Sequence, residues 1–173
     1  MSASRHSKRA VSTITAAVAC ALLLPSSSFA EEELPVAAQA EASSDDYGST
    51  VIKVNSAIRQ DGTDMVTVLW SVTVEGTDDF YAGDLKAGPF DYTGSGSTGV
   101  TALDEANQIR FYTLRDQRGY CLCAGLYTPG DFVDPVNEGS SATFWNTFMI
   151  PQETEKITLE FPGFDPAKYV AIE

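Results

Sequence analysis

A period-two alternation of side chains over residues 65–75 is the feature that most constrains the fold. Valines and one tryptophan occupy every second position from Val66 to Val74, and the positions between them are threonine or serine except for Leu69, with Glu75 next. Side chains of an extended strand point alternately to its two faces, so this pattern predicts a half-buried strand. No segment shows a convincing 3.6-residue helical period. We therefore expect an all-β chain.

Further strands are predicted on the same grounds. Residues 52–58 alternate in the same way and precede an Asp61-Gly62-Thr63 turn, so this segment should pair antiparallel with residues 65–75. Shorter strands are expected at residues 100–103, 109–114, 144–150, 157–161 and 170–172. About seven short strands separated by turn residues predict an antiparallel β-sandwich, and an antiparallel barrel of similar strand count is the alternative.

The first thirty residues have the features of an export signal. Three basic residues open the segment, residues 11–24 are apolar or small, and Ser28-Phe29-Ala30 is a small-x-small cleavage site. The apolar run is shorter than the ~20 residues that span a membrane. We predict a signal peptide over residues 1–30, cleavage after Ala30, a secreted protein and no membrane span after cleavage. A retained helix or a lipoprotein modified at Cys20 is the alternative, but processing at Cys20 would split the apolar run.

Composition limits the function of the mature chain. Without residues 1–30 the chain keeps eight basic and 24 acidic residues, a net charge of −16. This charge repels phosphates and anionic lipids, so neither nucleic acid nor a membrane surface is an expected partner. His6 is the only histidine and leaves with the signal peptide. Since no Ser–His pair, Cys–His pair or histidine metal ligand remains, we expect no enzymatic activity and no cofactor.

The rest of the chain divides into a spacer and one domain. Residues 31–48 are mainly alanine, glutamate, serine and aspartate, with little to bury, and we predict a disordered acidic spacer there. Residues 49–173 have the length and apolar content for a single domain with its own core.

Cys121 and Cys123 are the two cysteines of the predicted mature chain. Residues two apart on a regular strand lie about 6.6 Å apart, near the upper limit for a disulfide, so a bond requires a turn. Closing three residues stabilises a fold by only about 1.6 kcal/mol, so a bond would fix a local turn or remain reducible. A structural disulfide is favoured in an exported protein. A redox-active or intermolecular pair and a Cu(I) site are the alternatives.

Two long segments, residues 76–99 and 125–141, are candidate binding loops because they collect acidic and aromatic side chains. The candidate residues are Asp78, Asp79, Phe80, Tyr81, Asp84, Tyr92, Tyr127 and Phe132. Carboxylates of this kind hold calcium or serve as glycosidase acids, and exposed aromatic rings bind sugars or proteins. Solvated loop carboxylates, and aromatic side chains that cover the core, are the alternative interpretations.

Three segments resemble a known group of proteins. Gly99–Asp104, Tyr112–Asp116 and Gly119–Cys123 are similar to exported actinobacterial immunoglobulin-like domains of unknown function, whose marker is a Leu-Arg-Asp turn before Cys-x-Cys. The tail from Ile157 to Ile172 resembles the closing strands of the same group, so the similarity covers most of residues 49–173. The resemblance implies an immunoglobulin-like sandwich and a secreted or envelope location. It implies no activity.

The sequence thus predicts a secreted or envelope-associated binding or structural module, with an extracellular protein or a cell-wall component as its partner. An extracytoplasmic thiol-redox or copper-binding protein acting through Cys121 and Cys123 is the alternative. A hydrolase built on loop carboxylates is the least favoured hypothesis.

Overall fold

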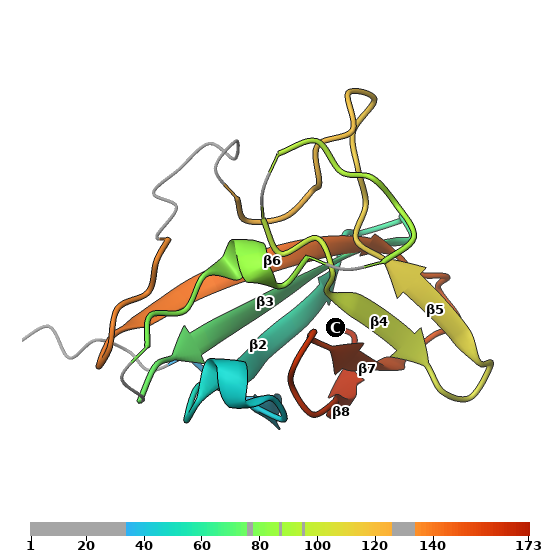
Figure 1. The fold of residues 1–173 in the computed structure, drawn as a ribbon. Coiled ribbons are helices and arrows are strands. Elements are labelled where there is room, and N and C mark those ends of the chain that lie inside the picture. Colours follow the sequence, from blue (N-terminus) through green and yellow to red (C-terminus); the bar gives the residue numbers. More distant parts are fainter. Residues whose placement is uncertain (1–33, 76–77, 87, 95, 126–133) are drawn as a thin grey trace, which may run out of the picture. The chain divides into compact units, whose positions relative to one another are not determined.

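A computed structural model describes residues 34–75, 78–86, 88–94, 96–125 and 134–173. The described chain forms eight strands in two antiparallel sheets of four, with two single-turn 3-10 helices (Figure 1). This arrangement confirms the predicted all-β class and is consistent with a β-sandwich. No helix of the described residues is long and apolar enough to cross a membrane. The predicted signal peptide lies outside these residues.

The strand order is simple in both sheets. The first sheet contains, in spatial order, β1 (Ala38–Glu41), β2 (Val51–Arg59), β3 (Met65–Thr73) and β6 (Ser141–Met149). The second contains β5 (Ile109–Tyr112), β4 (Thr101–Asp104), β7 (Lys156–Glu160) and β8 (Ala167–Ala171). The 3-10 helices are η1 (Asp45–Tyr47) and η2 (Ala82–Asp84). Seven of these strands lie where the sequence predicted them.

The alternating face of β3 is the centre of the core. Its inward side chains, from Val66 to Val72, are fully buried because β2 and β6 flank this strand and the second sheet covers it. The Trp70 ring stacks on Phe144 with the centroids 4.7 Å apart, and it meets Phe161 edge-on at 5.2 Å. The period of two in the sequence therefore corresponds to burial of one strand face.

The predicted disordered spacer is wrong for the part of residues 31–48 that the structure describes. β1 lies in this range and pairs antiparallel with β2, with Ala40 opposite Ile52 and fully buried. Alanine gives little hydrophobic signal in the sequence. It is nevertheless small enough to pack closely, and the ladder satisfies the backbone groups of both strands. The folded domain therefore begins before residue 49.

The outer edge of β6 is covered by the chain that follows β5. Leu114 N–H donates to the Thr147 carbonyl at 2.8 Å, and Thr147 N–H donates to the Leu122 carbonyl at 2.9 Å. Ala124 N–H donates to the Trp145 carbonyl at 2.8 Å. Main-chain hydrogen bonds thus connect β6 of the first sheet to the residues that follow β5 of the second sheet.

The sheets are also joined on the opposite side. Asp165 N–H donates to the Glu41 carbonyl, and Glu173 N–H donates to the Ala57 carbonyl, both at 2.9 Å. Arg59 N–H donates to the Glu173 carbonyl at 2.7 Å. Main-chain hydrogen bonds therefore join the two sheets at both sides, a feature shared with the barrel that was the alternative.

The immunoglobulin-like topology stays a prediction. In a constant-type immunoglobulin domain the second and third strands belong to different sheets. Here β2 and β3 form a hairpin within one sheet, with Ile52 opposite Val72 and Ile58 opposite Thr67. The structure therefore shows a two-sheet fold without establishing that strand order.

Candidate binding site on the outer face of the second sheet

The loop residues selected from the sequence do not form one described site. Asp78, Asp79, Tyr81 and Asp84 are all exposed. Tyr127 and Phe132 lie outside the described residues. No group of three or more histidine, cysteine, aspartate or glutamate side chains within the described part of the chain could hold a metal ion.

Phe80 is part of the core, so its predicted role as a binding-loop side chain is wrong. It is 2% exposed, and its ring lies 6.2 Å from Phe144 and 6.5 Å from Phe164, edge-on to both. Its backbone exchanges two hydrogen bonds with Val136, each 2.9 Å long. The bridge turns Phe80 inward and draws the two long loops together.

Tyr92 is only partly available to a ligand. Its hydroxyl donates to the Thr113 carbonyl, and the residue is half-buried. Burial raises the pKa of the phenol, although the positive charge of Arg115 acts in the opposite direction. This tyrosine therefore holds its loop against the end of β5.

The cysteine pair forms a disulfide, with a sulfur–sulfur distance of 1.96 Å and a Cα–Cα distance of 5.3 Å between Cys121 and Cys123. This Cα–Cα distance is shorter than on a regular strand, as a bond between these positions requires. Cys123 is fully buried and bridges to Asn146 on β6. A Cβ at Gly96 would lie 3.1 Å from Cys123 Sγ and 2.9 Å from the Ala124 carbonyl, so this close contact requires glycine. The bond fixes the segment that covers β6.

A buried amide lies beside the disulfide and is missing from the sequence prediction. Asn146 Oδ1 accepts from Trp70 Nε1 and Ser97 Oγ, both at 2.9 Å. Its Nδ2 donates to the Ser97 carbonyl at 2.8 Å and to Thr113 Oγ1 at 2.9 Å. These four bonds use the full capacity of the amide, so the cluster is a structural one.

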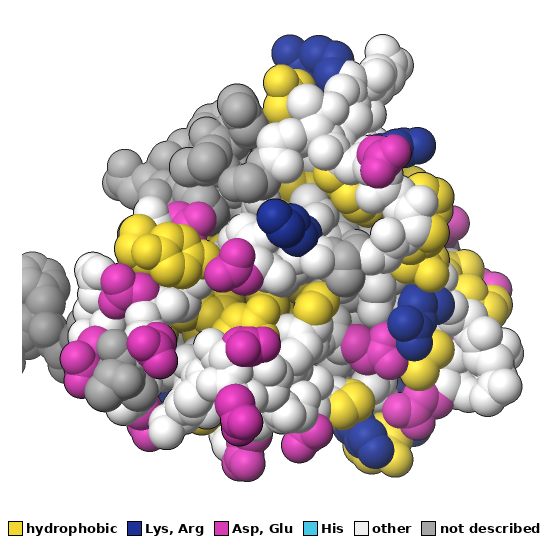
Figure 2. Space-filling model, viewed as in Figure 1, with side chains coloured by type: hydrophobic (Ala, Val, Ile, Leu, Met, Phe, Trp, Pro, Cys, Tyr) yellow, Lys and Arg dark blue, Asp and Glu magenta, His cyan; other side chains and the backbone are white. Residues whose placement is uncertain are grey.

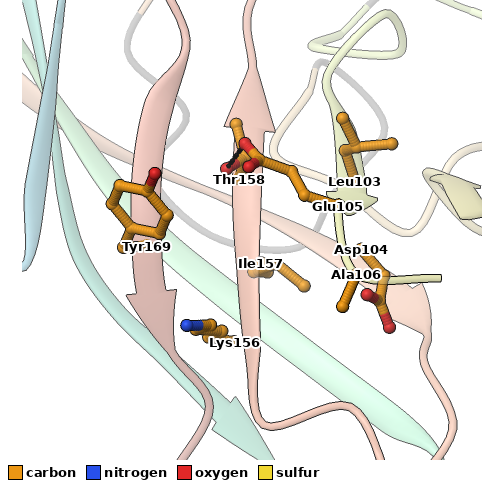
Figure 3. A pocket seen from close by; sticks show the side chains of 8 residues that line it. All are labelled: Leu103, Asp104, Glu105, Ala106, Lys156, Ile157, Thr158 and Tyr169. Carbon is orange, nitrogen blue, oxygen red and sulfur yellow. Dashed lines mark hydrogen bonds between the residues drawn. The ribbon is translucent and has the colours of Figure 1, made fainter. Parts of the chain in front are cut away.

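A concave site lies on the solvent-facing side of β4, β7 and β8. The hollow has a volume of about 280 Å³ (Figure 3). It is lined by Leu103, Asp104, Glu105, Ala106, Lys156, Ile157, Thr158 and Tyr169. Acidic side chains dominate the lower left of Figure 2, whereas basic, acidic and hydrophobic side chains are mixed at lower right, where Figure 1 places β4, β5 and β8.

A β-bulge exposes the aromatic ring of this site. Two residues of β8, Lys168 and Tyr169, stand opposite the single Thr158 of β7, because the register shifts between Ala167 and Val170. Strict alternation from the buried Ala167 would point Tyr169 into the core. The extra residue instead leaves Lys168 and Tyr169 both exposed, and Tyr169 is 65% exposed. Its φ of 62° is left-handed, which costs a non-glycine residue about 1 to 2 kcal/mol.

The polar groups of the site come from β7 and from the turn after β4. Thr158 Oγ1 donates to Glu105 Oε1 at 2.7 Å and holds this carboxylate across β7 (Figure 3). Lys156 Nζ lies 5.6 Å from the centroid of the Tyr169 ring. Among the described residues, neither Lys156 nor Glu105 forms an ion pair. The site thus presents an ammonium donor, a carboxylate acceptor and a ring.

Asp104 anchors the turn that carries Glu105. Its carboxylate accepts from Asn107 Nδ2 at 2.9 Å, from Asn107 N–H at 3.1 Å and from Thr154 Oγ1 at 2.8 Å. The hydrogen bonds from Asn107 and Thr154 lower the pKa of Asp104 despite its desolvation. Because its oxygens are already occupied, Asp104 positions the site without being free to react.

No family model, curated protein or solved structure matches this chain. The fold and the geometry of the hollow therefore define its class: a two-sheet β-protein with a concave site on one sheet face. Sequence reasoning missed Glu105, Lys156 and Tyr169 because they come from three separate elements. The sequence holds one hint, the adjacent apolar residues Tyr169 and Val170, but the bulge itself is defined only by the register with β7.

Proposed function

We propose that the protein is an exported, non-catalytic binding module, and that the outer face of the second sheet is its binding surface. The β8 bulge is the observation that carries this proposal. It holds Tyr169 in a left-handed conformation and turns the ring outward, beside a hollow with one donor and one acceptor side chain. Small-molecule sites typically combine an apolar concave surface with a few placed polar groups.

The state of the carboxylates favours binding over catalysis. Asp104 is buried and accepts hydrogen bonds from Asn107 and Thr154, so it is not poised to exchange a proton. A glycosidase needs two carboxyl groups directed at one bond. The hollow offers only the Glu105 carboxylate to solvent.

Export forms part of the same proposal. It is supported by the signal-like features of residues 1–30 and by the bonded distance of the Cys121–Cys123 pair, since disulfides persist in oxidising compartments. We also propose a relation to the exported actinobacterial domains, supported by the two-sheet fold and by the Leu-Arg-Asp and Cys-x-Cys residues.

The test is co-sedimentation of the secreted chain with isolated cell-envelope fragments. We expect binding that the double variant Lys156→Ala/Tyr169→Ala reduces at least tenfold. Ile58→Ala is the matched control, because Ile58 is 47% exposed but lies on β2 of the first sheet. Absence of sedimentation, or equal binding by the double variant and the control, would contradict the proposed surface.

Thiol–disulfide exchange through Cys121 and Cys123 is a second candidate function. Cys121 is partly exposed whereas Cys123 is buried, so one sulfur is open to an attacking thiolate. The measurement is the rate of mixed-disulfide formation with glutathione. A rate no faster than that of an unstructured peptide containing the same Cys-x-Cys disulfide would exclude this function.

A further inference from the structure

We infer that the hollow binds a neutral polyhydroxylated ligand, the sugar units of a glycan chain. This inference rests on the proposed function and names its ligand class. We call Tyr169, Lys156, Glu105, Thr158 and Leu103 the Tyr169 site.

The ring supplies the apolar part of such a site. Tyr169 is 65% exposed and projects from β8 next to the side chain of Lys156 (Figure 3). The face of an aromatic ring carries partial negative charge, so it attracts the weakly positive C–H groups on one side of a sugar ring. Leu103 and Ile157 complete the apolar lining.

Lys156 and Glu105 are the two exposed charges of the hollow; Asp104 also lines it, but Asn107 and Thr154 already occupy its carboxylate. Lys156 and Glu105 carry opposite charges, in a chain whose net charge is −13. An anionic ligand would be repelled by Glu105 and by the surrounding acidic surface, and a cationic ligand would have to compete with Lys156 for the face of the Tyr169 ring. A ligand without net charge avoids both repulsions.

The two polar side chains of the site call for a ligand group that both donates and accepts hydrogen bonds, as a hydroxyl does. Thr158 holds one Glu105 oxygen at 2.7 Å, which orients the carboxylate as an acceptor. Lys156 has three N–H donors and contacts the Tyr169 ring. A hydroxyl donates to the first group and accepts from the second, so neighbouring hydroxyls of one sugar satisfy both.

The shape favours a chain of sugars. A second, more open hollow is lined by Leu103, Glu105, Gln108 and Arg110. It shares Leu103 and Glu105 with the first, so the concave surface continues from β8 across β4 to β5. Arg110 pairs with Glu160 at 2.9 Å on the same sheet, which fixes this end of the surface.

A peptide fits this position less well. Extended peptides bind β-proteins mainly by adding a strand to an open sheet edge, where unpaired backbone groups are available. The Tyr169 site lies on a sheet face, and β4 and β7 are hydrogen-bonded on both sides. Recognition there must come from side chains.

The experiment is a calorimetric titration of the secreted chain with neutral oligosaccharides of glucose, mannose and N-acetylglucosamine, one to four units long. We expect saturable binding to at least one series, with affinity rising at least tenfold from one unit to three. Tyr169→Gly should weaken this binding at least tenfold. Glycine suits the left-handed backbone, so this variant keeps its fold. Glu105→Gln and Lys156→Met should each weaken it severalfold, and Ile58→Ala, on the first sheet, should change it less than twofold.

Failure of all three series to bind, or binding unaffected by Tyr169→Gly, would overturn the inference. An acidic uronate oligomer and an oligolysine peptide serve as charged competitors in the same titration. If either charged probe bound in a Tyr169-dependent way and the neutral sugars did not, the inferred ligand class would be wrong. If envelope sedimentation still depended on Lys156 and Tyr169, the proposed surface would stand and only the ligand class would fail.

Discussion

Single polar residues hold the centre of this fold. Asn146 is fully buried and joins Trp70 on β3 to Ser97 and Thr113, which belong to loops that cover the sheet. Removing the amide would leave several buried donors and acceptors without partners, and each such group costs about 1 to 3 kcal/mol. A hydrophobic pattern in the sequence cannot identify such a residue, because its partners lie far away along the chain.

We therefore expect Asn146→Ala to lower the free energy of unfolding by about 3 kcal/mol. Urea denaturation of the purified chain measures the change. Thr143→Ala is the control, because Thr143 is exposed on the same strand and should change stability by less than about 0.5 kcal/mol. Equal stabilities of the two variants would show that the Asn146 network contributes little.

Asp104 should make part of the stability depend on pH. Hydrogen bonds from Asn107 and Thr154 lower its pKa in the folded state, below the unfolded value of about 3.9. Its contribution is thus complete well above pH 4 and is lost as the pH falls through the folded-state pKa.

Asp104→Asn should consequently lower the free energy of unfolding at pH 7 by about 1 to 2 kcal/mol and flatten its decline below pH 4. Denaturant titrations at pH 7, 4, 3 and 2 test this. The exposed Asp79→Asn serves as the control and should follow the wild-type profile. An Asp104→Asn profile parallel to the wild type would contradict the assignment.

At the scale of elements, the residues of the Leu-Arg-Asp and Cys-x-Cys motifs have structural roles in the segment between β5 and residue 125. Leu114 pairs with β6, and the Arg115 guanidinium lies 5.6 Å from the Phe90 ring centroid. Asp116 Oδ1 accepts from the N–H groups of Arg118 and Tyr120 at 2.8 and 2.9 Å. Desolvation opposes ionisation of Asp116, but these bonds and the Arg118 charge outweigh it and lower its pKa. Each marker residue thus shapes or anchors the turn.

Removing the disulfide should therefore loosen this segment and leave the rest folded. For Cys121→Ala/Cys123→Ala we expect a loss of about 1.6 kcal/mol, because the closed loop has only three residues. Hydrogen exchange should rise at the Leu122 and Ala124 amides, which bond to Leu114 and to Trp145. The Val68 amide in the central strand is the internal control. Complete unfolding of the double variant would show that the bond stabilises the whole domain.

Whether a strand can be predicted from the sequence depends on how the rest of the fold surrounds it. β2 and β3 were predicted because a half-buried face imposes a period of two on the sequence. β1 was missed because its alanines resemble a flexible spacer, and the β8 bulge was missed because it exists only relative to the register of β7. The binding site depends on that bulge, so sequence reasoning placed the candidates on the acidic aromatic loops instead.

For the whole molecule, the proposed export makes a prediction about the N-terminus of the functional chain. We predict that protein recovered from the culture medium begins at Glu31 and contains the Cys121–Cys123 bond. Intact mass before and after reduction and alkylation measures both features at once. A chain that retains Met1, or one that begins at a lipid-modified Cys20, would contradict the predicted cleavage after Ala30.

The covered edge of β6 has a consequence for self-assembly. β6 runs Ser-Ala-Thr-Phe-Trp-Asn-Thr-Phe-Met, nine residues without a charge or a proline. Segments of this composition stack into fibrils when their edge is open to another chain. Leu122 and Ala124 occupy that edge, and the neighbouring disulfide holds them there. We therefore expect the Cys-x-Cys bond to help keep this edge closed to other copies of the domain.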